Sequence, residues 1–184
     1  MIRAAVTHIP LLWLLVLLCL PVSDLSAHAE TGEYEVKAAM VYNMIRFMDW
    51  PEDALPATTP QLTVCVVGTG PLGAALGSLQ GKQVKSKTIT LRQLDPAAGT
   101  GGCQVLVMSA HDKLVTNRLL EKSRSSAVLT VADSAGFARS GGVVGFTLQD
   151  GRVRFEINLA AAQRHRIRIS AQLLKLAQIV QEAQ

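Results

Sequence analysis

The stretch that decides the fold is GGVVGFTLQDGRVRFEINLAAAQRHRIRISAQLLKLA, residues 141–177. Near its middle, Asp150-Gly151 separates two runs in which apolar and polar residues alternate. This pattern predicts a β-hairpin with a two-residue loop. Such a loop fixes the strand register, so Phe146 should face Phe155 and Val144 should face Ile157.

The predicted register assigns each hairpin side chain to one of two faces. The face expected to pack on the core carries Val144, Phe146, Leu148, Val153, Phe155 and Ile157. The opposite face carries Gly145, Thr147, Arg152, Arg154 and Glu156. Because this second face pairs charged residues with small ones, we expect it to meet water or a partner protein.

The first 29 residues have the features of a secretory signal peptide. Arg3 supplies a positive charge, residues 11–20 form an apolar run, and Ala27-His28-Ala29 is an A-x-A cleavage site. The run is short for a membrane span of about 20 residues; an uncleaved anchor is the alternative interpretation. We therefore expect an exported protein with one mature domain over residues 30–184.

Charge and cysteine content bear on the partners and on the compartment. The formal net charge is +4. In an exported protein this balance favours an anionic surface or an acidic partner protein over nucleic acid. Cys65 and Cys103 lie beyond the signal peptide. An oxidising compartment and an even count favour a disulfide, and two buried free thiols are the alternative.

Apolar periodicity in the rest of the chain predicts strands that alternate with helices. The expected strands cover residues 62–67, 88–91, 104–108 and 128–131. The expected helices cover residues 33–48, 113–123, 159–164 and 170–182, with a short one ending near 79. In the helix over 113–123, Leu114, Leu119 and Leu120 should face inward. We predict an α/β layered sandwich whose mixed sheet, with parallel first strands and the C-terminal antiparallel hairpin, is covered by helices.

One glycine motif resembles a nucleotide site but is incomplete. Gly68-Thr-Gly-Pro-Leu-Gly73 matches GxGxxG after a predicted strand. A dinucleotide site also needs an acidic residue after the second strand, where this chain has Arg92. Pro71 also removes one N–H from the turn. We expect a tight turn that begins a helix, and no cofactor.

Catalytic and metal-binding patterns are equally incomplete. Ser109, His111 and Asp133 suggest a hydrolase triad, but no GxSxG motif accompanies them. His111 and His165 belong to separate predicted elements, and arginines flank His165, which disfavours a metal ion. We predict no catalytic residues and no metal site.

A basic cluster follows the hairpin: Arg164, His165, Arg166 and Arg168. Without interleaved aromatic residues it is typical of a solvated face rather than of a nucleic-acid site. An acidic protein surface or an anionic lipid head group is the alternative.

Several segments together resemble the YfiR family of bacterial periplasmic regulators. The matching segments are Lys37–Pro51, Leu62–Gly68, Pro71–Gly73, Gly81-Lys82, Cys103–Leu106, Leu129–Asp133, Phe137, Gly141-Gly142, Arg154–Asn158 and Ile169–Ala177. Each segment alone is weak, but their order and spacing together are specific.

The resemblance implies regulation rather than catalysis. Such proteins bind the periplasmic domain of an inner-membrane diguanylate cyclase and hold it inactive, which lowers cyclic di-GMP and biofilm formation. An envelope lipoprotein can sequester the repressor, and family members tend to form homodimers. The resemblance also supports a Cys65–Cys103 bridge. Better-studied members carry a second cysteine pair in the closing region, which this chain lacks.

The partner contacts are expected on the outward hairpin face and on the segment after it. The predicted contact residues are Arg152, Arg154, Glu156, Asn158, Arg168, Gln172 and Lys175. A periplasmic small-ligand sensor without a cyclase partner is the alternative function. In that case Tyr42, Phe47 and Trp50 would line the pocket.

Overall fold

The computed structural model describes residues 24–183 apart from 98, 110 and 111. The predicted signal peptide therefore lies outside the described residues, except for its end, which belongs to helix α1 (Asp24–Arg46). In the described part of the chain, no helix is both long and apolar enough to cross a membrane. The boundaries of the signal peptide and of the mature domain stay predictions.

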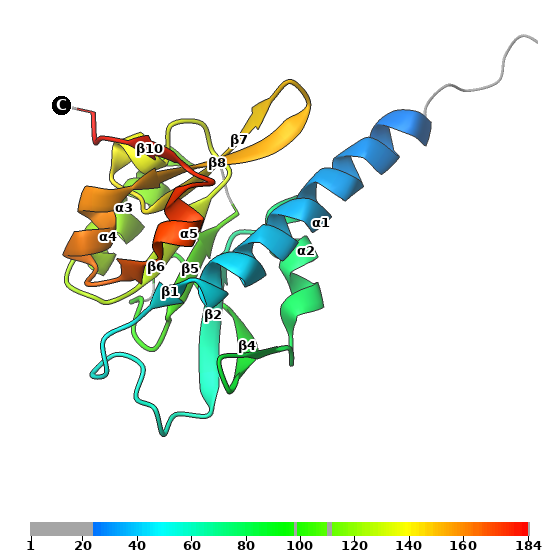
Figure 1. Ribbon diagram of the computed structural model, residues 1–184. Helices are drawn as coiled ribbons and strands as arrows, with labels where there is room; N and C mark the ends of the chain where they lie inside the picture. Colours follow the sequence, from blue (N-terminus) through cyan, green and yellow to red (C-terminus); the bar gives the residue numbers. More distant parts are fainter. Residues whose placement is uncertain (1–23, 98, 110–111, 184) are drawn as a thin grey trace, which may run out of the picture.

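A mixed sheet of eight strands forms the centre of the described molecule, in the order β10-β8-β7-β6-β5-β2-β4-β3 (Figure 1). Its strands are β2 (Gln61–Val67), β3 (Gln83–Val84), β4 (Lys87–Gln93), β5 (Val105–Met108), β6 (Leu129–Ala132), β7 (Val144–Gln149), β8 (Arg152–Asn158) and β10 (Gln178–Val180). Five strands that are adjacent in the sheet pair in parallel, in the order β4, β2, β5, β6 and β7, whereas β7 and β8 are antiparallel. The predicted arrangement of parallel first strands followed by an antiparallel hairpin is confirmed.

Helices cover both faces of the sheet. One buried apolar cluster draws on α1, α2 (Pro71–Ala75), η3 (Leu76–Leu79), α4 (Leu159–Arg164) and α5 (Ala171–Leu174). A second cluster draws on α3 (Lys113–Ser123). Strand β2 alternates between them, because Val64 and Val66 belong to the first and Cys65 and Val67 to the second. The predicted layered α/β sandwich is confirmed.

The β7–β8 hairpin has the predicted register. Phe146 pairs with Phe155 and Val144 with Ile157. Asp150 and Gly151 have φ angles of 50° and 70°, and two positive values define the type I′ turn that an Asp-Gly loop favours. We call residues 147–154 the hairpin tip, and residues 144–146 with 155–158 the hairpin base.

The base and the tip differ in burial. Phe146 and Phe155 are 2% and 6% exposed, so the base packs in the core as predicted. Leu148 is 56% exposed, and the expectation that it faces the core is wrong. The cause is the length of the neighbouring strands: β6 pairs with β7 only at Val144 and Gly145. The tip therefore extends beyond the apolar layer, as Figure 1 shows.

The C-terminal helix predicted over residues 170–182 is wrong. Ser170 does cap a helix, since its Oγ accepts a hydrogen bond from the Leu173 N–H at 3.3 Å, but α5 ends at Leu174. Gln178–Val180 then forms β10, parallel to β8. A short apolar run fits a helix and a strand equally well, and the open edge of β8 decides in favour of the strand.

Two further predictions about helices need correction. Leu119 and Leu120 of α3 are buried as expected, but Leu114 is 77% exposed. It lies in the first turn, where the Asp112 carboxylate caps the backbone N–H of Leu114 at 2.8 Å. The first helix ends at Arg46 rather than Met48, because Met48 and Asp49 form β1.

The short strand β1 (Met48–Asp49) pairs antiparallel with β9 (Arg168–Ile169). This two-stranded sheet joins the end of α1 to the segment before α5, and the Ser170 N–H extends it by donating to the Phe47 carbonyl at 2.9 Å. It was not predicted, since two residues are too few to show a strand pattern.

Candidate interaction surface

The hairpin tip carries two of the predicted contact residues, Arg152 and Arg154. Both side chains are exposed. Arg154 stands opposite Thr147 across the hairpin, and Arg152 stands opposite Gln149. Within the described chain neither guanidinium forms an ion pair. The tip therefore presents two adjacent positive charges that are available to a partner.

Two other predicted contact residues, Glu156 and Asn158, are buried. Glu156 is 6% exposed and accepts a hydrogen bond from the Arg139 guanidinium at 3.1 Å. Asn158 is fully buried: its Oδ1 accepts from the Ala161 N–H at 2.9 Å, and its Nδ2 donates to the Ala138 carbonyl at 2.8 Å. The expectation that these side chains face outward is wrong, because they hold the fold together.

The cover over Glu156 and Asn158 is the segment around η4 (Ala138–Ser140). Two glycines let it approach the base. A Cβ on Gly142 would meet the Phe137 ring at 2.1 Å, and one on Gly145 would lie 3.2 Å from the Ala138 nitrogen. These glycines are the sequence signal from which a covered face could have been predicted.

The remaining predicted contacts are Arg168, Gln172 and Lys175, and all three side chains are exposed. Arg168 lies in β9, and the other two lie on or just after α5. Figure 1 places α5 apart from the hairpin tip. The seven predicted residues therefore do not form one surface: two lie on the tip, three lie near α5 and two are buried.

An apolar hollow beside the tip was missed from the sequence. Its lining includes Gly32, Val36, Leu148 and Val153, from α1 and from the hairpin. Val36 is 48% exposed, and with Leu148 it leaves apolar surface in water next to Arg152. Exposed apolar surface beside unpaired charge is typical of a protein-binding site.

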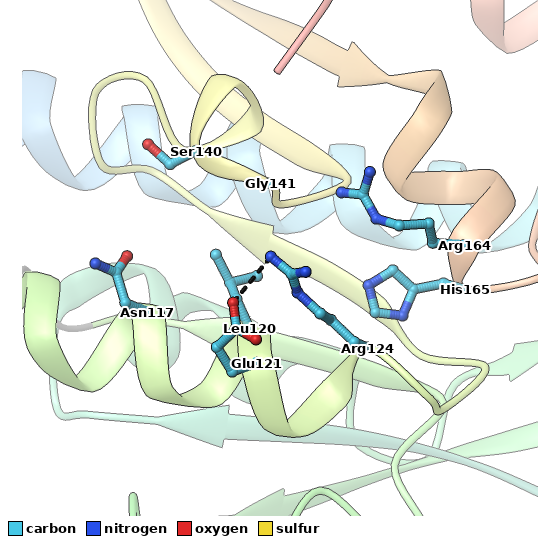
Figure 2. Close-up of a pocket in the computed structure, with 8 residues that line it drawn as sticks. All are labelled: Asn117, Leu120, Glu121, Arg124, Ser140, Gly141, Arg164 and His165. Carbon is cyan, nitrogen blue, oxygen red and sulfur yellow. Dashed lines mark ion pairs between the residues drawn. The ribbon is translucent and has the colours of Figure 1, made fainter. Parts of the chain in front are cut away.

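The basic cluster after the hairpin is dispersed by the fold. Arg164 pairs with Glu182 at 2.7 Å, and Arg166 pairs with Asp53 at 2.8 Å. Figure 2 shows Arg164 and His165 beside Arg124 and Glu121 of α3, in a cavity of about 340 Å³. Arg124 pairs with Glu121 at 2.8 Å. Most of these charges are thus already neutralised by acidic neighbours.

His165 contributes to the structure between α4 and the loop after α3. The side chain is 2% exposed, and its Nδ1 lies 2.9 Å from the Ser126 carbonyl oxygen. Burial lowers the pKa of His165, and the nearby Arg164 charge adds to this, while the bond to Ser126 opposes it. The neutral imidazole is therefore the form that suits the folded protein.

The disulfide expected between Cys65 and Cys103 is present, with the two Cα atoms 5.7 Å apart. Both cysteines are buried, and the bridge ties β2 to the residues just before β5. The Arg92 guanidinium lies over it, with Nη2 3.3 Å from one sulfur and 3.1 Å from the other. A closed bridge fits an oxidising compartment.

The glycine motif packs against protein rather than around a ligand. A Cβ on Gly70 would lie 2.1 Å from the Ser109 carbonyl oxygen, and one on Gly73 would lie 2.9 Å from Val66. The Gly73 N–H donates to Ser109 Oγ at 2.9 Å. The space that a phosphate would need is therefore occupied by the end of β5, and the turn begins α2 as expected.

Asp133, which was considered for a hydrolase triad, is engaged elsewhere. Asp133 pairs with Lys37 at 3.4 Å, and Lys37 also binds Glu33 at 2.6 Å. His111 lies outside the described residues. Among the described residues, no cluster of three or more His, Cys, Asp or Glu side chains is arranged to hold a metal ion.

The aromatic residues considered for a ligand pocket mostly join elements of the fold. The Tyr42 hydroxyl donates to the Gln83 carbonyl at 2.8 Å, and Trp50 Nε1 donates to the Gln104 carbonyl at 3.0 Å. The cavity beside Trp50 is about 140 Å³. That is below the roughly 300 Å³ at which ligand pockets usually start.

Comparison with known proteins places the chain in a family. The family model described as DUF4154: YfiR/HmsC-like matches residues 34–178. This range starts within α1 and ends at the first residue of β10, so it contains both bridged cysteines and all seven predicted contact residues. Among curated proteins, none matches the chain.

Proposed function

Since the chain belongs to the YfiR/HmsC-like family, we propose that it is a periplasmic repressor of an inner-membrane diguanylate cyclase. It binds the periplasmic domain of the cyclase and holds the enzyme inactive, which lowers cyclic di-GMP and biofilm formation. Family membership supports a regulatory rather than a catalytic role, and a periplasmic location. The Cys65–Cys103 bridge supports the same location.

The observation that carries a protein-binding role is the hairpin tip. Arg152 and Arg154 are exposed there without acidic partners in the described chain, and Val36 and Leu148 leave apolar surface beside them. Unpaired charge next to exposed apolar surface favours an acidic protein partner. Arg168, Gln172 and Lys175 form a second group of candidate contacts near α5.

The proposal includes two further interactions. Release of the cyclase occurs when an envelope lipoprotein sequesters the repressor, and the repressor itself is a homodimer. Sedimentation of the purified protein at several concentrations checks the dimer. Capture from the envelope fraction, followed by mass spectrometry, checks the cyclase and the lipoprotein.

Deleting the gene tests the function directly. In a strain that keeps its membrane cyclases, deletion should raise cellular cyclic di-GMP, and the wild-type gene should restore the lower level. The double variant Arg152→Glu/Arg154→Glu should fail to restore it. Arg118→Glu is the matched control, because Arg118 is an exposed arginine on α3. Unchanged cyclic di-GMP after deletion would contradict the proposal.

A further inference from the structure

The outer edge of β8 has free backbone groups near the hairpin tip. In a two-residue type I′ hairpin, the pair that closes the loop, Gln149 and Arg152, exchanges both backbone hydrogen bonds. The pattern then alternates along β8. Arg152 and Arg154 turn their N–H and C=O groups toward β7, whereas Val153 and Phe155 turn theirs to the outside.

The neighbouring strand β10 reaches only one of these groups, the Phe155 carbonyl, which in the parallel pairing of Glu156 with Gln178 accepts from the Gln178 N–H. The Phe155 N–H and both backbone groups of Val153 lie beyond the start of β10. β10 pairs with β8 only at Glu156, Ile157 and Asn158. Among the described residues, no other strand pairs with β8 on that side, and no turn or loop hydrogen bonds to the backbone of Val153 or Phe155. Beside Arg152–Phe155, the sheet therefore has an unoccupied place in line with β10.

The side chains along this edge define what an added strand would meet. Arg152 and Arg154 project on one face of β8. On the other face lie Val153, Leu148 and Val36, around the hollow between the hairpin and α1, whose lining also includes Arg152 and Glu33, the latter paired with Lys37. An extended segment whose acidic and apolar side chains alternate would meet the arginines on one face and the hollow on the other.

Charge argues against a second copy of this chain at the edge. Two β8 edges paired about a two-fold axis would bring Arg152 and Arg154 of one protomer against the same residues of the other. Like charges opposite one another destabilise a strand pair. Positively charged side chains on an edge strand are also a common way in which proteins avoid self-association.

We propose that the β8 edge at Arg152–Phe155 binds an extended, acidic–apolar alternating segment of the partner protein, which adds a strand to the sheet. That the partner is a cyclase rests on the function proposed above. The added strand lies end to end with β10. It displaces the exposed hydrogen bond between the Gln149 and Gln178 side chains, 3.3 Å long, which reaches from the tip to the start of β10.

The opposite edge of the hairpin supplies an internal control. By the same alternation, Phe146 and Leu148 of β7 turn their backbone groups away from β8, and β6 pairs with β7 only at Val144 and Gly145. Thr147 lies between these two residues and Gln149 ends β7, and both have uncharged side chains. The β7 edge therefore offers backbone groups without the arginines, and we expect it to stay free.

The first test uses the purified exported protein and a synthetic eight-residue peptide of alternating Glu and Val. Amide hydrogen exchange is measured by NMR at Val153, Phe155 and Leu148. At saturating peptide, exchange at Val153 and Phe155 should slow roughly tenfold or more, while Leu148 should not change. The same peptide with Lys in place of Glu should have no effect. Equal protection by both peptides, or protection at Leu148 instead, would overturn the proposal.

Proline variants separate the two edges. Val153→Pro removes an outward N–H without breaking a β7–β8 hydrogen bond, and it should abolish peptide binding. Leu148→Pro makes the matching change on the β7 edge and should leave binding intact. Because a proline can disturb the hairpin, Arg152→Glu/Arg154→Glu provides a second measure: it should transfer binding from the Glu peptide to the Lys peptide. If the peptide still binds after both Val153→Pro and the charge reversal, the β8 edge is not the binding site.

Failure of this inference can be told apart from failure of the proposed function. If the wild-type protein captures a cyclase and Val153→Pro captures it equally well, the function stands and the strand-addition mode is wrong. If the wild-type protein captures no cyclase but the Glu peptide protects Val153, the mode stands and the cyclase assignment is wrong. If the wild-type protein is a dimer and Val153→Pro is a monomer, the edge binds a second copy of the chain. That result would overturn the proposal that the edge binds an acidic partner.

Discussion

The base and the tip of the β7–β8 hairpin are built from the same two strands, in one register, with one alternation of side chains. Phe155 in the base is 6% exposed, whereas Leu148, on the same face in the tip, is 56% exposed. The difference comes from the neighbours: β6, β10 and η4 lie against the base and stop before the tip. Local sequence thus determines the register of the hairpin, and contacts with distant segments determine which part of it is buried.

The largest expected difference between the regions is in apolar packing. Phe155→Ala should lower the free energy of unfolding by about 3–5 kcal/mol, because it leaves a cavity in the base. Leu148→Ala on the same face should lower it by less than about 1 kcal/mol. Urea denaturation of both variants makes the measurement. Equal losses would show that the tip is covered in solution.

Charge reversal on the opposite face gives the next largest difference. Glu156→Lys should cost about 2–3 kcal/mol, since it buries a cation beside Arg139. Arg154→Glu should change stability by no more than about 0.5 kcal/mol while weakening partner binding. Thermal unfolding compares the two variants. A destabilised Arg154→Glu would contradict the exposure of the tip.

Asn158→Ala should cost about 1–2 kcal/mol. The change removes the N-cap of α4 and leaves the Ala138 carbonyl without its donor. Gln172→Ala is the control, because Gln172 is an exposed polar residue from the same set of predicted contacts. If both variants unfold at the same urea concentration, the base does not depend on its buried polar groups.

The smallest effect should be the pH dependence from His165, which follows α4 beyond the base. Burial lowers the pKa of His165 in the folded protein, so the unfolded chain binds its proton more readily. Its contribution to stability is complete above the unfolded pKa of about 6.5 and declines as the pH falls below that value. Urea midpoints at about pH 7.5 and about pH 5.5 should therefore differ more in the wild type than in His165→Gln. An equal difference would place the pH dependence elsewhere.

The sequence was sufficient for the features that depend on near neighbours. Asp150-Gly151 fixed the hairpin register, and two cysteines in an expected export product predicted the Cys65–Cys103 bridge. The features that it did not predict depend on contacts between distant segments. The covers over Glu156 and Asn158 come from η4, and the Gln178–Val180 run becomes a strand only because β8 offers it an edge.

The candidate surface was predicted only in part, for the same reason. Arg152 and Arg154 were correctly expected to be exposed, because the hairpin pattern determines their face and the segment that covers Glu156 does not reach the tip. Whether they contact a partner stays a prediction. Val36 could not be connected with them from the sequence, since α1 and the hairpin meet only through the fold of the whole chain.

The pairing of β1 with β9 has a consequence for how the protein matures. Met48 meets Ile169, so a strand near the start of the chain finds its partner only near the end. Closing so long a loop is costly in entropy, and such contacts form late. A chain that crosses the membrane from its N-terminus would present the apolar side of α1, with Val41 and Ile45, before β9 has emerged. We therefore expect an exported chain to need protection by chaperones during that interval, and truncation before Arg168 should direct it to proteolysis rather than to a partly active form.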